Sequence, residues 1–310
     1  MTERLTSPQA TGGAGVIFEY RVAGIMLSRL LRGAHVPVGT VLPLLRVGLQ
    51  QRNAGYPLDD IVAHTLPREG CTVAPIIQIQ VKKSLRIATQ NEDAAFVKVI
   101  AAAIEVCLEH TAEVEAGAML LGLAVGEDPK TVLPDLAHLT VIAREHASAE
   151  LFRQQFRPGA SNEARRGLHE KVSAAVGTAI ASDDAAIIEH LVHQTLGALH
   201  VWPVSAEDDG RDWRTELDGL SDMAAGAGLT ASDLLTYLCR LAEGIGAHGG
   251  LVDAAHVRRE LFGRFGIQLS PPGVSQPSRP HGMTINIKNV YGSVNNAETQ
   301  NFYGGHRYER

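Results

Sequence analysis

The chain has 310 residues, 45% of them hydrophobic and 20% charged, as is usual for a globular protein with a sizeable core. No apolar run approaches the roughly 18 residues that span a bilayer, and the N-terminus lacks the apolar stretch of a signal peptide. We therefore expect a cytoplasmic protein with no membrane partner. Three widely spaced cysteines, Cys71, Cys107 and Cys239, argue against both a disulfide framework and a cysteine metal site.

Charge is unevenly distributed along the chain. The formal net charge is −6, which by itself argues against a nucleic-acid partner. Residues 1–90, however, carry ten Lys/Arg and five Asp/Glu, whereas the remainder carries 18 and 29. A basic N-terminal part joined to an acidic part is compatible with local binding of a polyanion.

The N-terminal part is predicted to mix helix and strand. Apolar residues recur at helical spacing over residues 16–32, and Gly33 ends this helix. Three short β-rich segments follow, at residues 44–49, 61–66 and 75–82, and another helix begins near residue 93. The connections between these strands are too short for helical crossovers, so the pairing is predicted to be antiparallel. This order indicates an α/β core.

The rest of the chain is predicted to be helical up to residue 269. Asp183–Asp184 and Thr230 have the residue types that begin helices, and we find no internal repeat. Residues 270–281 are rich in Pro and Ser, as in a linker. Residues 282–310 alternate polar with β-branched or aromatic residues, which predicts a short β-rich tail. So small a hairpin needs further strands, so we expect it to assemble the chain into a homo-oligomer.

Four polar residues in the basic part are candidates for a catalytic site: Glu19, Asp60, Gln80 and Lys82. Glu19 lies on the apolar face of the first helix, where a buried carboxylate needs a cation or hydrogen-bond donors. Asp60, with Asp59 beside it, directly precedes the second strand. Strand periodicity places Gln80 and Lys82 on one face of the third strand.

Each of these positions also has a structural explanation. A Glu near a helix N-terminus is favoured by the helix dipole, paired aspartates are common in turns, and a Lys on an edge strand can be solvated. Together, however, two carboxylates and an amide oxygen are ligands that suit Mg²⁺ or Mn²⁺. A neighbouring lysine can orient a water molecule or offset charge on a phosphate. The set therefore favours metal-assisted hydrolysis of a phosphodiester.

Three segments carry a family resemblance: GVIFEYRVAG at 15–24, PLDDIVAH at 57–64 and QVKKSL at 80–85. In this order they resemble the PD-(D/E)xK nuclease superfamily, in its Mrr-like branch where Gln replaces the acidic residue of the ExK half-motif. They are similar in particular to double-stranded-DNA endonuclease domains of bacterial anti-phage effectors. The resemblance covers roughly residues 13–108. Arg21 departs from it, because relatives often carry Gln there.

The resemblance implies a restriction-endonuclease-like domain at 1–108, and the helical pattern beyond it predicts an all-α domain at 109–269. The resemblance also implies that Glu19, Asp60 and Gln80 contact the metal, with Asp59 as the alternative to Asp60, and that Lys82 serves the attacking water. Lys83 and Arg86 are then expected to contact DNA phosphates.

The function predicted from the sequence is thus a metal-dependent DNA endonuclease, and the resemblance implies that it acts in anti-phage defence. No phosphate-binding loop of an NTPase is visible, so activation is expected to depend on the acidic helical part, the tail or a separate sensor or NTPase partner. The alternative is a catalytically inactive nuclease-fold adaptor that assembles through its tail. An RNA-directed nuclease would have the same sequence pattern.

Overall fold

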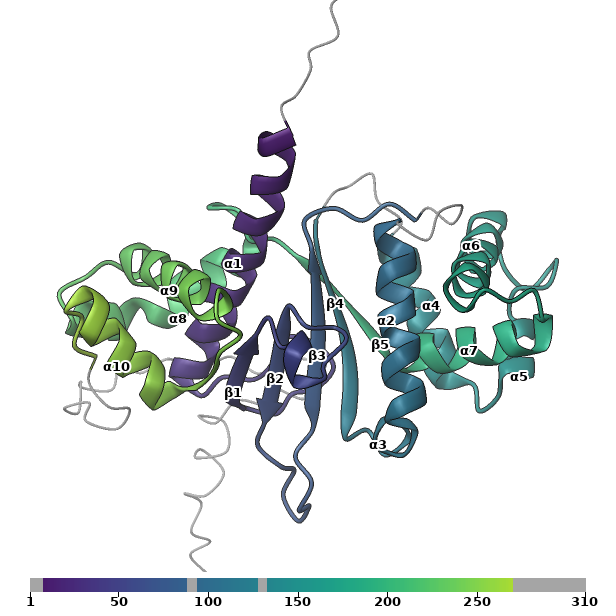
Figure 1. Cartoon of the computed structure of the whole chain (residues 1–310), viewed down its shortest axis with the longest axis horizontal. Helices are drawn as coiled ribbons and strands as arrows, with labels where there is room; N and C mark the ends of the chain where they lie inside the picture. The colour runs from purple at the N-terminus through teal and green to yellow at the C-terminus, as the bar shows by residue number, and fades with distance from the viewer. Residues whose placement is uncertain (1–7, 88–93, 128–132, 270–310) are drawn as a thin grey trace, which may run out of the picture. The chain divides into compact units, whose positions relative to one another are not determined.

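A six-stranded mixed sheet is the centre of the computed structural model, with strand order β5-β4-β3-β2-β1-β6 (Figure 1). The structure describes residues 8–87, 94–127 and 133–269, with side chains from residue 13 onward. The strands are β1 (Leu44–Leu49), β2 (Ile61–Thr65), β3 (Ile76–Lys82), β4 (Met119–Gly126), β5 (Leu199–Val204) and β6 (Leu251–Asp253). β2 pairs antiparallel with β1 and β3, and β6 pairs antiparallel with β1, whereas β3, β4 and β5 run parallel.

Helices cover both faces of this sheet (Figure 1). One layer consists of α1 (Pro8–Arg32), α8 (Arg211–Gly226), α9 (Ala231–Gly246) and α10 (Ala254–Phe265). The opposite layer consists of α2 (Ala95–Glu109), α3 (Thr111–Glu115), α4 (Leu133–Glu145), α5 (Ala149–Gln154), α6 (Glu163–Ile180) and α7 (Ala185–Ala198). The apolar core is accordingly divided in two, one half on each face of the sheet. None of the described helices combines the length and apolar character that a membrane crossing demands.

The α/β character and the first three strands are confirmed. β1 spans the residues predicted for it, and β2 and β3 differ from the prediction by one residue at one end. Asp184 caps α7 through its side chain, and Thr230 forms a capping box with Asp233 at the start of α9. The linker at 270–281 and the tail at 282–310 lie outside the described residues.

The prediction of an all-α region at 109–269 needs correction. Strands β4, β5 and β6 lie in that range, and residues on both sides of 108 belong to one contact unit. The apolar run MLLGLAVG of β4 is buried between helical layers, so it lacks the alternation that reveals a half-exposed strand. Periodicity alone cannot distinguish such a run from a buried helix. The sheet therefore contains strands from both predicted domains, the nuclease domain at 1–108 and the helical domain at 109–269.

A buried ionic cluster fixes α1 against α8. The Glu216 side chain is fully buried, and its carboxylate lies 2.8 Å from Nε of Arg29 and also pairs with Arg32. Ser28 donates a hydrogen bond of 2.7 Å to the same carboxylate. All three partners lie on the C-terminal half of α1, so this carboxylate sets the position of the helix that carries Glu19.

Replacing Glu216 with Ala should therefore destabilise the protein strongly. Removing one side of a buried ion pair leaves uncompensated charge and costs about 3–5 kcal/mol. Urea denaturation followed by circular dichroism would measure the free energy of unfolding. The matched control is Glu150→Ala, which removes an exposed pair with Arg153 and should change that free energy little. Equal effects of the two substitutions would contradict the anchoring role of Glu216.

Candidate active site

The buried carboxylate of Asp60 is the centre of the candidate site. Ile61 pairs with Ile79 across the β2–β3 ladder, so Asp60, one residue earlier, comes opposite Gln80. Its Oδ2 accepts hydrogen bonds from the Gln80 amide and, at 2.7 Å, from the backbone N–H of Val81. Lys82 Nζ lies 3.6 Å from the same oxygen. Three of the four predicted residues therefore meet at the end of β3.

The local sequence of β3 explains why Gln80 and Lys82 face Asp60. Ile77, Ile79 and Val81 point into the core beneath α1, so the alternating residues take the other face of the strand. Gln78, two residues before Gln80, is buried, and its amide donates a hydrogen bond to Met119 Sδ. The Gln78 side chain therefore has a structural role. Gln80 and Lys82 lie nearer the C-terminal end of β3, against Asp60.

Asp59 is placed differently from Asp60. Its backbone carbonyl accepts a hydrogen bond from Gln51 N at 2.9 Å, and its side chain is half-buried on the wall of a neighbouring pocket. Burial is the main cause that raises the pKa of the Asp60 carboxyl, and the negative charge of Asp59 adds to that rise. The geometry thus brings Asp60, rather than its neighbour, against Gln80 and Lys82.

Glu19 reaches this site from α1 through Gln50. The Gln50 amide donates a hydrogen bond to Glu19 Oε1, and Gln50 N donates to the backbone carbonyl of Asp60 at 3.3 Å. Burial, followed by the negative charge of Asp60, raises the pKa of Glu19 to about 7, while Lys82 and the Gln50 hydrogen bond oppose the rise. The two carboxylates therefore share one electrostatic environment.

Gln50 was missed by the sequence reasoning, which interpreted residues 50–57 as a turn. Its φ is +53°, a left-handed conformation that is uncommon for a residue other than glycine and that often marks functional sites. The adjacent Gln51 holds this conformation, because its amide donates to the carbonyls of Leu49 and Gly249 at 3.0 and 2.7 Å. The sequence feature that could have pointed to Gln50 was the pair of glutamines directly after a buried strand.

The donor set fits a divalent cation. Asp60 and Glu19 are both partly removed from water, and burial is the main cause that raises the pKa of each carboxyl. Their ionised forms are therefore unfavourable, and a bound cation would stabilise them. Rotating the Gln80 amide by a half-turn would present its oxygen in place of its nitrogen. Within the described residues, no group of three or more His, Cys, Asp or Glu side chains is arranged to hold a metal. Such a cation would consequently depend on the amide and on water for its other ligands.

The remaining predicted residues lie around the site. Lys83 and Arg86 are exposed on the segment that follows β3. A Cβ at Gly126 would meet the carbonyl oxygen of Lys83 at 2.4 Å, so this glycine allows the segment to pass close to the end of β4. Arg21, the position that departs from the family pattern, bonds Ala206 O at 2.9 Å and Asp208 at 2.8 Å, and therefore holds the loop after β5.

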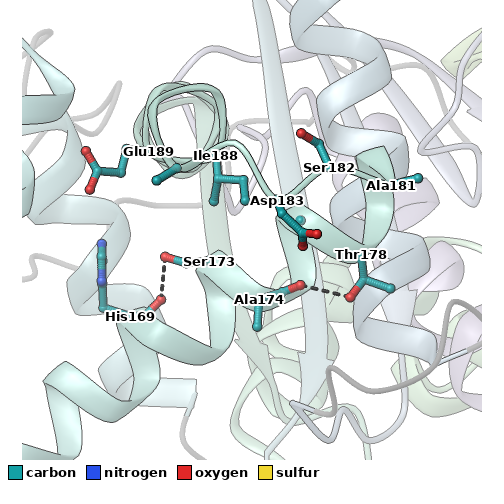
Figure 2. A pocket seen from close by; sticks show the side chains of 11 residues that line it. His169, Ser173, Ala174, Thr178, Ala181, Ser182, Asp183, Ile188 and Glu189 are labelled. Atoms are coloured by element: carbon teal, nitrogen blue, oxygen red, sulfur yellow. Dashed lines mark hydrogen bonds between the residues drawn. The ribbon is translucent and has the colours of Figure 1, made fainter.

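A second hollow, between α6 and α7, does not assemble a comparable set (Figure 2). Ser173 and Thr178 line it, and their hydroxyls donate to carbonyls of their own helix, those of His169 and Ala174. The His169 ring stacks on Phe156 at 4.3 Å, and burial lowers the pKa of His169 to about 4. A neutral, packed imidazole and helix-bonded hydroxyls indicate a structural role.

Comparison with known proteins gives little further information. No family model and no curated protein matches the chain. Among solved structures, the Moraxella osloensis Cap4 SAVED/CARF-domain containing receptor is similar over 81% of this chain and 48% of its own, with 10% identity and a TM-score of 0.38. The chain spans about half the length of that receptor, and at this TM-score no property is transferred from it.

The charge on Glu19 should destabilise the folded protein in the absence of metal. Its folded pKa of about 7 exceeds the ordinary value of 4.5, so the ionised form is the unfavourable one. This cost is absent below about pH 4.5 and fully developed above pH 7. Glu19→Gln should therefore raise the melting temperature by a few degrees at pH 8 in EDTA and leave it nearly unchanged at pH 4.

The exposed Glu105 on α2 provides the control for removing one acidic charge, as Glu105→Gln. Differential scanning fluorimetry at both pH values would compare the two variants with the parent protein. A lower melting temperature for Glu19→Gln at pH 8 would show that the ionised carboxylate stabilises the fold, which is the opposite of what its raised pKa implies.

Proposed function

We propose that this chain is a metal-dependent DNA endonuclease whose active site consists of Glu19, Asp60, Gln80 and Lys82. The observation that supports it most is the meeting of Asp60 with Gln80 and Lys82 at one strand end, with Glu19 linked to them through Gln50. The anti-phage role in this proposal rests on the resemblance of three sequence segments. Mg²⁺ or Mn²⁺, when bound, would polarise the phosphodiester and lower the pKa of a bound water.

The protein's own groups divide the work. Asp60 and Glu19 would hold the cation, and Gln80 would complete its oxygen ligands. The hydrogen bond from Val81 N–H orients the Asp60 carboxylate, so its geometry does not depend on a flexible side chain. The Lys82 ammonium, two-thirds buried, would orient the attacking water and offset the negative charge that develops on the phosphate. Lys83 and Arg86 would contact neighbouring phosphates of the duplex.

The first test is cleavage of supercoiled plasmid with Mg²⁺ or Mn²⁺ against EDTA. Lys82→Ala should reduce the cleavage rate by about 10²–10³-fold, because one preorganised charge at a phosphoryl centre supplies that much. The control is Lys171→Ala, which removes an exposed lysine on α6 and should cleave at the parent rate. Full activity of a folded Lys82→Ala protein would contradict the assignment of Lys82, whereas no cleavage by the parent protein with either metal would favour the inactive adaptor.

A second test separates the two adjacent aspartates. Asp60→Asn should abolish cleavage, because it removes the carboxylate charge that faces Lys82 and Gln80. Asp59→Asn should retain most of the activity, since Asp59 acts on the site through charge at longer range. Plasmid nicking rates, measured on variants with parent-like circular dichroism, would decide between them. The reverse order of activities would move the metal ligand to Asp59.

A further inference from the structure

A polar pocket of about 540 Å³ adjoins the candidate active site. Gln50 and Asp59 line it; Gln50 is hydrogen-bonded to Glu19, and Asp59 directly precedes Asp60. The 3₁₀ turn η1 (Arg52–Ala54) also lines it, as do residues 246–249, at the end of α9 and in the loop before β6. Its volume is in the range of small-molecule sites, and it lies beside the atoms proposed to cut DNA.

Both hydrogen-bond donors and acceptors line this pocket. Arg52 and Asn53 line it and are exposed; a guanidinium offers only donors, and an amide offers both kinds of group. Asp59, which also lines the pocket, adds a carboxylate acceptor. A phosphate presents acceptors alone and would be repelled by Asp59, whereas base edges present donors and acceptors together. The lining thus suits a nucleobase better than a phosphate.

Small residues and a firmly held turn also favour a planar ligand. Ala54, Gly246, Ala247 and Gly249 contribute small or absent side chains to the pocket surface, which leaves room for a planar ring. η1 is anchored at one end by Gln51, whose amide bonds Gly249 O, and closes at the other with Gly55 at φ +88°. Arg52 is steadied by a 3.4 Å contact to Pro57 O, which occupies one of its five N–H donors. The exposed His248 also lines the pocket and offers an aromatic face.

We propose that this pocket binds a nucleobase of the DNA strand beside the cleaved phosphodiester, with Arg52 and Asn53 reading its edge. The proposal rests on the nuclease function proposed above and deepens it, because it assigns base recognition to residues outside the metal-binding set. Arginine pairs with the edge of guanine and asparagine with that of adenine, so cleavage acquires a preference for a purine at one position near the cut. The turn after β1 is then the part of the protein that determines specificity.

The first experiment measures where the chain cuts. A plasmid is digested with Mn²⁺ and the new ends are sequenced for the parent protein, Arg52→Ala and Asn53→Ala. Arg68→Ala is the matched control, an exposed arginine in the turn that joins β2 to β3 at the opposite end of these strands. We expect a base preference next to the cut that falls by about tenfold in both pocket variants, since a good base contact gives about 1–3 kcal/mol of discrimination. The preference should persist in Arg68→Ala, and a preference unchanged by Arg52→Ala and Asn53→Ala would overturn the proposal.

The second experiment does not require catalysis. The four deoxynucleosides and deoxyribose 5-phosphate are tested for binding by saturation-transfer NMR. Deoxynucleoside signals that weaken in Arg52→Ala and Asn53→Ala, without competition from the sugar phosphate, support a base pocket even if the protein cleaves no DNA. Cleavage without such binding and without altered cut sites would overturn the pocket and leave the nuclease function standing. Displacement of the nucleosides by the sugar phosphate would identify a phosphate site instead and overturn the proposal.

Discussion

The need to satisfy one buried carboxylate, that of Asp60, determines the arrangement around the candidate site. A charged group out of contact with water is costly unless donors or cations meet it. Val81 N–H and the Gln80 amide, both on β3, donate hydrogen bonds to this carboxylate. The positively charged ammonium of Lys82, on the same strand, forms an ion pair with it. The antiparallel register of β2 and β3 brings these groups opposite Asp60. The pairing of β2 with β3 thus positions the residues to which the chemistry is assigned.

The second carboxylate depends on a longer chain of contacts. Glu216 clamps the C-terminal half of α1, and Gln50 joins the helix to the end of β1 through Glu19. The left-handed conformation of Gln50 and the raised pKa of Glu19 are both unfavourable for folding, and both occur at the same place. Backbone strain and shifted pKa values tend to cluster at functional sites in proteins.

Sequence reasoning predicted the N-terminal elements well because their patterns are local. The alternation of Ile77, Ile79 and Val81 with Gln80 and Lys82 fixed both the strand and the face that carries the candidate residues. It did not predict β4, whose apolar run is buried between two helical layers and loses its alternation. It also did not predict β5, an edge strand that contains His200 and Pro203, because a proline within a segment argues against a strand. Nor did it predict Gln50, since a role that arises from an unusual φ and from a contact to a distant helix leaves no periodic signal.

The proposed chemistry depends above all on Asp60, Gln80 and Glu19 holding one divalent cation together. The most direct measurement is anomalous diffraction from crystals of the full chain soaked in Mn²⁺, with crystals of Asp60→Asn as the comparison. We expect an anomalous peak within coordination distance, about 2.0–2.3 Å, of Asp60 and Glu19 oxygens, and its loss in the variant. A peak centred on Asp59 alone, or none at the end of β3 at a saturating concentration of Mn²⁺, would contradict this metal site.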